Sequence, residues 1–135
     1  MMKYLLSTIL LLLIVGFSYC QLTVTIQQRS FCTYHFDEDI LTDCVSKPET
    51  SVFHIDKYES EICFTVDGVT DTYHVMGTTH QHYGIFTYRV LSHMNNEYIL
   101  IFDLKKGWVV ALFIDDYEKG NKTVEAVRFR IKEII

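Results

Sequence analysis

Short runs of alternating apolar and polar residues, separated by turn sequences, recur along the chain after residue 50. Because successive side chains of a strand point to opposite faces, this period of two is typical of sheets and not of helices. We expect strands at residues 52–55, 62–66, 72–76, 85–91, 98–104 and 108–114. Consecutive short strands joined by hairpins predict a mainly β fold, a small antiparallel up-and-down barrel, with a sandwich as the alternative.

Turn sequences between the expected strands support the hairpins. The pair Asp67-Gly68 directly follows the strand expected at 62–66, and both residues tolerate the positive φ that a two-residue hairpin turn requires. Residues 94–96 (Met-Asn-Asn) and 105–107 (Lys-Lys-Gly) reverse the chain in the same manner. Neighbouring strands are therefore expected to be antiparallel.

The N-terminal part of the chain is less regular. Leu22, Val24 and Ile26 alternate with threonines and predict one strand. Residues 31–50 contain several acidic residues, two cysteines and the only proline of the chain. We interpret this segment as a long loop, with at most one short helical turn, pinned by a disulfide.

The C-terminal segment breaks the strand pattern. Val124, Val127, Ile131 and Ile134 recur every three or four residues, and Thr123 precedes them as a possible helix cap. This spacing predicts a closing amphipathic α-helix. Apolar residues in the same segment also alternate in part, so a strand is the competing interpretation.

The first residues of the chain have the features of a secretory signal peptide. Lys3 precedes an apolar run at 4–17, which is shorter than the roughly 20 residues that span a bilayer. Small residues near its end suit cleavage after Ser18, with cleavage after Cys20 as the alternative. We therefore expect a secreted, extracellular protein whose residues 19–135 form a single β-barrel-like domain.

Two kinds of covalent modification are expected in an exported chain. The four cysteines, Cys20, Cys32, Cys44 and Cys63, are disulfide candidates, and three pairings are possible. Cleavage after residue 20 would leave three of them. Asn121 begins an Asn-Lys-Thr sequence in an expected loop, which is an acceptor pattern for N-glycosylation.

Charge and motifs exclude several function classes. Loss of Lys3 with the signal changes the net charge from −5 to −6, which argues against nucleic acid or an anionic membrane surface as the partner. No Gly-x-Ser-x-Gly, phosphate-binding glycine loop or His-Glu-x-x-His is present. We therefore expect a protein that is not an enzyme and uses no cofactor.

Two histidines are weak candidates for a metal site. His80 and His82 alternate in a polar segment expected as a loop after residue 76, and further histidines lie nearby in sequence. Imidazoles could hold zinc, but no glutamate close to the pair could act as a base. A histidine-dependent metalloenzyme is therefore the weakest of the functional hypotheses.

Residues 97–116 read Glu-Tyr-Ile-Leu-Ile-Phe-Asp-Leu-Lys-Lys-Gly-Trp-Val-Val-Ala-Leu-Phe-Ile-Asp-Asp, followed by a charged loop and an amphipathic segment. This part of the chain, roughly residues 84–135, resembles the last two barrel strands and closing helix of lipocalins. The resemblance implies an eight-stranded cup that captures a small apolar molecule.

Three neighbouring strands each carry apolar and aromatic residues on one face. The ligand-pocket candidates are Phe86, Tyr88, Tyr98, Leu100, Phe102, Trp108 and Val110. If these faces meet, they form an aromatic wall of the kind that apolar ligand pockets use, although the same residues could fill a solid core. The opposite faces are also apolar between residues 99 and 113, so another element must cover one side of the sheet.

The favoured function is that of a secreted, non-catalytic binding protein for a small hydrophobic ligand. The alternative is a secreted interaction module with a packed core, which binds a host or receptor protein through its surface.

Overall fold

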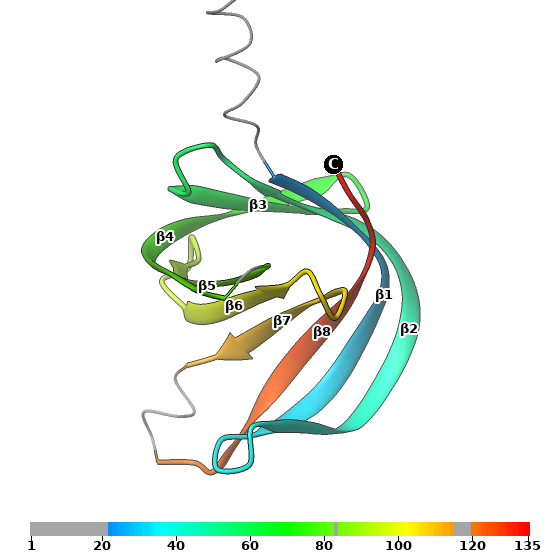
Figure 1. Ribbon diagram of the computed structural model, residues 1–135, viewed down its shortest axis with the longest axis vertical. Coiled ribbons are helices and arrows are strands. Elements are labelled where there is room, and N and C mark those ends of the chain that lie inside the picture. The colour runs from blue at the N-terminus through cyan, green and yellow to red at the C-terminus, as the bar shows by residue number, and fades with distance from the viewer. Residues whose placement is uncertain (1–21, 83, 115–119) are drawn as a thin grey trace, which may run out of the picture.

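The chain folds as a closed antiparallel barrel of eight strands in sequence order (Figure 1). The computed structural model describes residues 22–82, 84–114 and 120–135. The strands are β1 (Leu22–His35), β2 (Ile40–Ile55), β3 (Glu61–Val66), β4 (Val69–His82), β5 (Ile85–Leu91), β6 (Glu97–Asp103), β7 (Trp108–Phe113) and β8 (Thr123–Ile134). Antiparallel pairing of β1 with β8 closes the barrel. The expected up-and-down barrel is confirmed, whereas the expected signal peptide lies outside the described residues.

The tight turns have the backbone conformations that their sequences predict. Asp67 and Gly68 join β3 to β4 with φ values of 51° and 76°, so both central residues have positive φ. Asn95 and Gly107 also have positive φ, at 64° and 76°, in the turns on either side of β6. These conformations suit the right-handed twist of a hairpin, which explains why asparagine, aspartate and glycine occupy these positions.

Residues 31–50 do not form the expected long loop. They form most of a long hairpin, in which β1 and β2 pair from Leu22↔Ile55 to His35↔Ile40. The disulfide between Cys32 and Cys44 joins the two strands directly. Pro48 is compatible with a strand here because β3 pairs with β2 only from residue 51 onward, which leaves the earlier part of β2 as an edge.

The C-terminal segment does not form the expected amphipathic helix. It forms the strand β8, and the described residues contain no helix. Val124 and Ala126 are buried on one side of β8, whereas Val127 and Phe129 pack on the other. The apolar residues of β8 therefore belong to two clusters on opposite faces of the strand. Taken together, they recur every three or four residues, which is the spacing typical of an amphipathic helix. Within the part of the chain that the structure describes, no helix has the length and apolarity needed to cross a membrane.

Aromatic rings fill the barrel interior. Phe53 is almost fully buried, and its ring centroid lies 4.6 Å from that of Phe64, 5.0 Å from Phe129 and 5.6 Å from Phe102. Aliphatic residues complete this cluster: Val24, Ile26, Ile55, Ile62, Val90, Leu100 and Val109. The interior is therefore a packed core built from nearly every strand.

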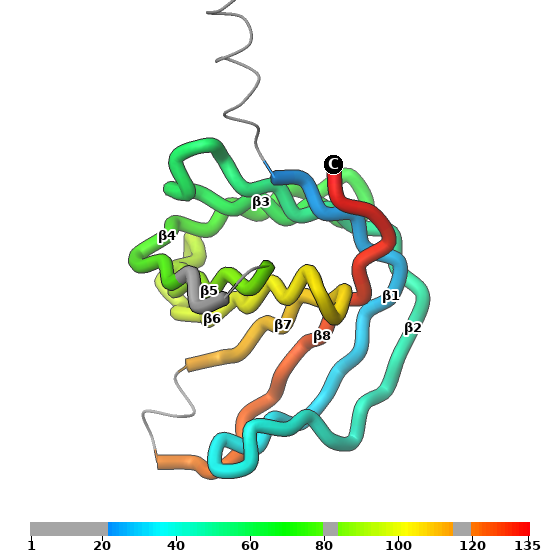
Figure 2. Tube along the Cα trace, in the orientation of Figure 1, coloured from blue at the N-terminus to red at the C-terminus, as the bar shows by residue number. Residues whose placement is uncertain are grey.

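A second core lies on the outer face of the barrel. Val110, Leu112, Val124 and Ala126 are buried there, on β7 and β8. The distal end of the β1–β2 hairpin turns back over this face, and its cyan tip lies beside the start of β8 in Figure 2. The backbone N–H of Phe36 donates a hydrogen bond of 3.1 Å to the carbonyl of Lys122 at that contact. The hairpin therefore supplies the cover that two apolar sheet faces require.

Candidate functional site

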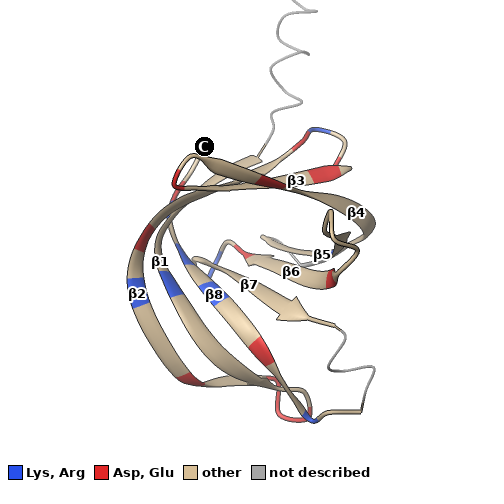
Figure 3. Cartoon of the chain, turned by 180° about the vertical axis from the view of Figure 1, so that it is seen from behind, with Lys and Arg blue, Asp and Glu red and all other residues tan. Residues whose placement is uncertain are grey.

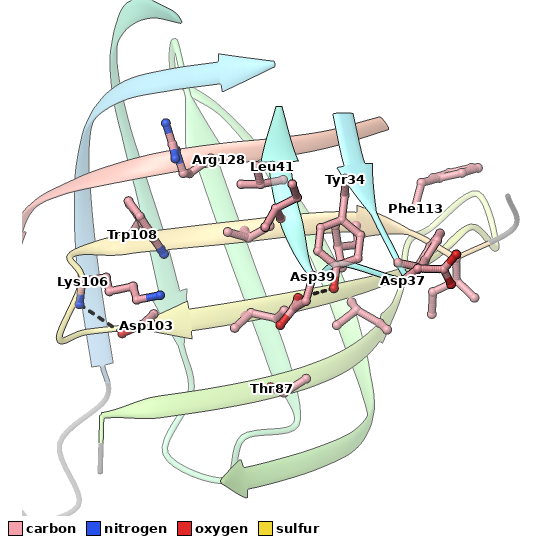
Figure 4. Close-up of a pocket in the computed structure, with 17 residues that line it drawn as sticks. Tyr34, Asp37, Asp39, Leu41, Thr87, Asp103, Lys106, Trp108, Phe113 and Arg128 are labelled. Carbon is pink, nitrogen blue, oxygen red and sulfur yellow. Dashed lines mark hydrogen bonds between the residues drawn. The ribbon is translucent and has the colours of Figure 1, made fainter. Parts of the chain in front are cut away.

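A cleft of about 910 Å³ lies between the hairpin tip and the outer face of β5, β6, β7 and β8 (Figure 4). Its floor is apolar, with Ile99 and Ile101 from β6 and Val110 and Leu112 from β7. Cross-strand pairing places Ile99 opposite Leu112 and Ile101 opposite Val110, so the four side chains form one continuous surface. A volume in this range is typical of small-molecule sites.

The β1–β2 hairpin forms the other wall of the cleft. Tyr34 and Leu41 pair across the hairpin and both line the cleft, together with Phe36. The rings of Tyr34 and Phe36 meet edge to face, with centroids 5.2 Å apart. The Cys32–Cys44 disulfide lies two residues from Tyr34 and ties the two strands of this wall together.

The Tyr34 hydroxyl donates a hydrogen bond to Asp39 Oδ1 (Figure 4). Burial, and then this bond to a carboxylate, raise the pKa of Tyr34 to about 12, so its hydroxyl stays protonated at neutral pH. Asp37 and Asp39 both line the cleft from the hairpin turn. This end of the cleft is therefore acidic.

The opposite end of the cleft is basic and contains the only tryptophan of the chain. The Arg128 guanidinium carbon lies 4.8 Å from the centre of the Trp108 ring system, and the Lys106 ammonium lies 5.7 Å from it. Both distances are in the range of cation–π attraction. Asp103 lies close by, and its Oδ1 accepts a hydrogen bond of 3.0 Å from the backbone N–H of Lys106 (Figure 4).

The structure divides the ligand-pocket candidates between the two faces of the sheet. Tyr88, Leu100 and Phe102 are buried in the barrel interior, and Phe86 and Tyr98 pack against them. Trp108 and Val110 instead line the outer cleft.

The seven candidates therefore do not form one wall. Because Trp108 pairs with Asp103 and Phe102 pairs with Val109, the side chains of Trp108 and Phe102 point to opposite faces. The spacing along each strand identifies the residues that share a face, but it does not give the register between strands.

Two polar groups inside the barrel were not anticipated from the sequence. Tyr88 is almost fully buried, and its hydroxyl donates a hydrogen bond of 2.6 Å to Glu59 Oε1 in the turn between β2 and β3. Burial, and then the bond to Glu59, raise the pKa of Tyr88. Arg29 pairs with Glu49 at 2.8 Å, and its guanidinium lies 4.9 Å from the centre of the Phe129 ring.

The remaining candidates have different outcomes. Cys32 and Cys44 form a disulfide, whereas Cys63 is a half-buried thiol whose Sγ lies 3.6 Å from Thr72 Oγ1. Cys20 lies outside the described residues. Asn121 is exposed just before β8, as a glycosylation acceptor requires.

The metal candidates are not placed by the structure. The backbone of His80 and His82 belongs to β4, so the expected polar loop there is wrong, but their side chains lie outside the described part of the molecule. Among the side chains that are described, no group of three histidine, cysteine or acidic residues is arranged to hold a metal ion.

Comparison of the chain with protein-family models, with curated proteins and with solved structures finds no match. The signal that could have located the cleft in the sequence is the second apolar face of residues 99–112, which requires a cover.

Proposed function

We propose that this protein is a secreted, non-catalytic binding protein, and that it takes up a small hydrophobic ligand in the outer cleft. The observation that carries the proposal is the apolar floor of Ile99, Ile101, Val110 and Leu112 within a cleft of about 910 Å³. Apart from Thr87 on β5, the polar residues that line the cleft lie at its two ends. Sites for small apolar molecules have this composition.

The proposal keeps the barrel that the resemblance to lipocalins implies, but it places the ligand elsewhere. An antiparallel barrel of eight strands in sequence order supports the resemblance. The ligand position, however, differs from the one that the resemblance implies, because the packed rings of Phe53, Phe102 and Phe129 occupy the barrel interior. We place the ligand between the sheet and the hairpin instead.

Secretion is supported by the Cys32–Cys44 disulfide, since such bonds persist mainly in oxidising compartments. Expression of the full chain in eukaryotic cells, followed by intact-mass analysis of the medium, tests this point. We expect a chain that has lost residues 1–18, retains the disulfide and carries a glycan at Asn121. Retention of the whole chain inside the cells would contradict the proposal.

Ligand binding is tested with an uncharged apolar probe such as dodecanol. Because Trp108 is the only tryptophan and lines the cleft, its emission reports occupancy. We expect dodecanol to change the Trp108 emission in a saturable manner, and Ile101→Phe to weaken binding by filling the cleft. Val69→Phe is the matched control, because Val69 is exposed in the β3–β4 hairpin. Equal binding by both variants, or no saturable response to apolar probes, would refute the cleft as the site.

A further inference from the structure

We infer that the ligand of the cleft is an amphipathic anion, an apolar chain with one carboxylate, sulfate or phosphate group that lies between Lys106 and Arg128. This inference rests on the proposed function and specifies the chemical class of the ligand. It follows from the distribution of charge along the cleft, with two cations and the buried Asp103 carboxylate at one end, an apolar floor, and the carboxylates of Asp37 and Asp39 at the other end.

The basic end has two cations beside the Trp108 ring. Arg128 and Lys106 both lie within 6 Å of the centre of the Trp108 ring, at 4.8 and 5.7 Å. The half-buried indole thus holds the guanidinium near the cleft without neutralising its charge. A planar guanidinium can bind a carboxylate or phosphate through two parallel hydrogen bonds.

Neither cation forms an ion pair within the described ranges. Arg29 and Arg89, by contrast, pair with Glu49 and Glu97 at 2.8 and 2.7 Å. The nearby carboxylate of Asp103 is buried and accepts a hydrogen bond from the backbone of the β6–β7 turn. The two side chains at the basic end are therefore available to an external anion.

A further cation lies close to this end. Arg130 pairs with Trp108 across β7 and β8, and its exposed side chain shares the outer face. Basic residues on β8 and its neighbours are visible in Figure 3, although the whole chain has a net charge of −5. A local positive field on an acidic protein favours an anion at this one place.

The other end of the cleft sets the orientation of the ligand. The hairpin turn carries Asp37 and Asp39 at the cleft, and acidic residues at this tip are visible in Figure 3. These carboxylates repel an anionic group, so the head of the ligand lies near Trp108 and its chain extends toward the hairpin turn. Between the two ends, β7 extends five residue steps from Trp108 to Phe113, which corresponds to about 16 Å at ~3.3 Å per residue.

Three ligands of equal chain length test the inference: dodecanoate, dodecanol and dodecyltrimethylammonium, each below its micelle concentration. Isothermal titration calorimetry is used because it does not depend on the environment of Trp108. We expect dodecanoate to bind about tenfold more tightly than dodecanol, since a charge-assisted hydrogen bond contributes at least this much. The cationic ligand should bind more weakly than dodecanol.

Variants assign the effect to the two cations. We expect Arg128→Gln and Lys106→Gln each to weaken dodecanoate binding by about tenfold and to change dodecanol binding by less than about twofold. Lys57→Gln is the matched control, because Lys57 is an exposed lysine beside an aromatic ring, Tyr58, in the β2–β3 turn. It should leave the affinity for dodecanoate unchanged.

The outcomes separate this inference from the proposed function. Equal affinity for the three ligands would overturn the anionic class but leave apolar binding in the cleft intact, whereas binding of none of them would refute the proposed function itself. An equal effect of Lys57→Gln would indicate a general charge effect and would also overturn the inference. So would binding to phosphatidylserine vesicles without binding of monomeric dodecanoate, because the anionic surface itself would then be the ligand.

Discussion

The hydroxyl of Tyr88, inside the barrel, donates a hydrogen bond of 2.6 Å to Glu59, in the turn between β2 and β3. This contact joins the middle of β5 to a segment 29 residues earlier in the chain. Because Tyr88 is almost fully buried, its hydroxyl depends on this partner and not on bulk water.

Loss of this hydrogen bond is expected to destabilise the barrel modestly. Tyr88→Phe removes the hydroxyl but retains the ring contact with Phe102, and it should lower the free energy of unfolding by about 1 kcal/mol. Urea denaturation monitored by Trp108 emission measures the change. Tyr58→Phe is the control, since Tyr58 is 76% exposed and should leave the midpoint unchanged. A similar loss in both variants would contradict a specific role for the bond to Glu59.

Stability is expected to decrease in alkaline solution. The usual pKa of tyrosine is 10.0. The pKa of Tyr34 is raised to about 12, and the pKa of Tyr88 is also raised. Between pH 10 and the raised values the folded state retains protons that the unfolded state has released, so the free energy of unfolding decreases as pH increases. Below pH 10 this contribution is fully present.

Thermal unfolding between pH 8 and pH 11 checks the direction of this dependence, and the Tyr34→Phe/Tyr88→Phe double variant should show a shallower decrease above pH 10. An unchanged slope in the double variant would show that other groups cause it.

The Cys32–Cys44 disulfide is expected to stabilise both the fold and the cleft. It closes a segment with a sequence separation of 12, for which chain entropy gives about 3 kcal/mol of stabilisation. The Cys32→Ala/Cys44→Ala variant should lose roughly this amount in guanidinium denaturation. It should also bind dodecanol more weakly than the parent protein, because Tyr34 and Leu41 are then held less firmly over the floor. Cys63→Ala, which alters a half-buried thiol away from the cleft, should retain the affinity of the parent.

Packing of the aromatic interior is expected to dominate stability. Phe53→Ala removes a ring that touches three other phenylalanines and should cost about 3–5 kcal/mol. Phe31→Ala is the matched control, because Phe31 is 47% exposed and should cost far less. Equal shifts of the denaturation midpoint would indicate that the interior is not the packed core described above.

Between residues 52 and 114 the sequence predicts most strands and turns well, apart from the last part of β4, because alternation and turn sequences are local signals. Alternation identifies which residues share a face, and Asp67-Gly68 or Asn95 identifies where the chain reverses. Local patterns fail where both faces of a strand are apolar. Val124 and Ala126 face one core and Val127 and Phe129 face the other, and this mixture produced the incorrect helix at the C-terminus.

The cleft could be predicted only in part. The sequence indicates that a second apolar sheet face between residues 99 and 113 must be covered. It does not indicate that the β1–β2 hairpin covers it. Residues 31–50 contain Pro48, two cysteines and an acidic turn, which are typical of a loop, although their pairing with β1 makes them a strand. The position of Trp108 outside the barrel depends on its pairing with Asp103, and such registers depend on long-range contacts.

Pro48 has a consequence for how the molecules behave in concentrated solution. The first part of β2, before its pairing with β3 begins at residue 51, is an unpaired strand edge that also exposes Val45. Such an edge is a template onto which a strand of a neighbouring molecule could add. A proline without an N–H group, next to the charged Lys47 and Glu49, makes this addition unfavourable. The first part of β2 can therefore remain an unpaired edge, because Pro48 and its charged neighbours disfavour the strand addition that leads to fibres.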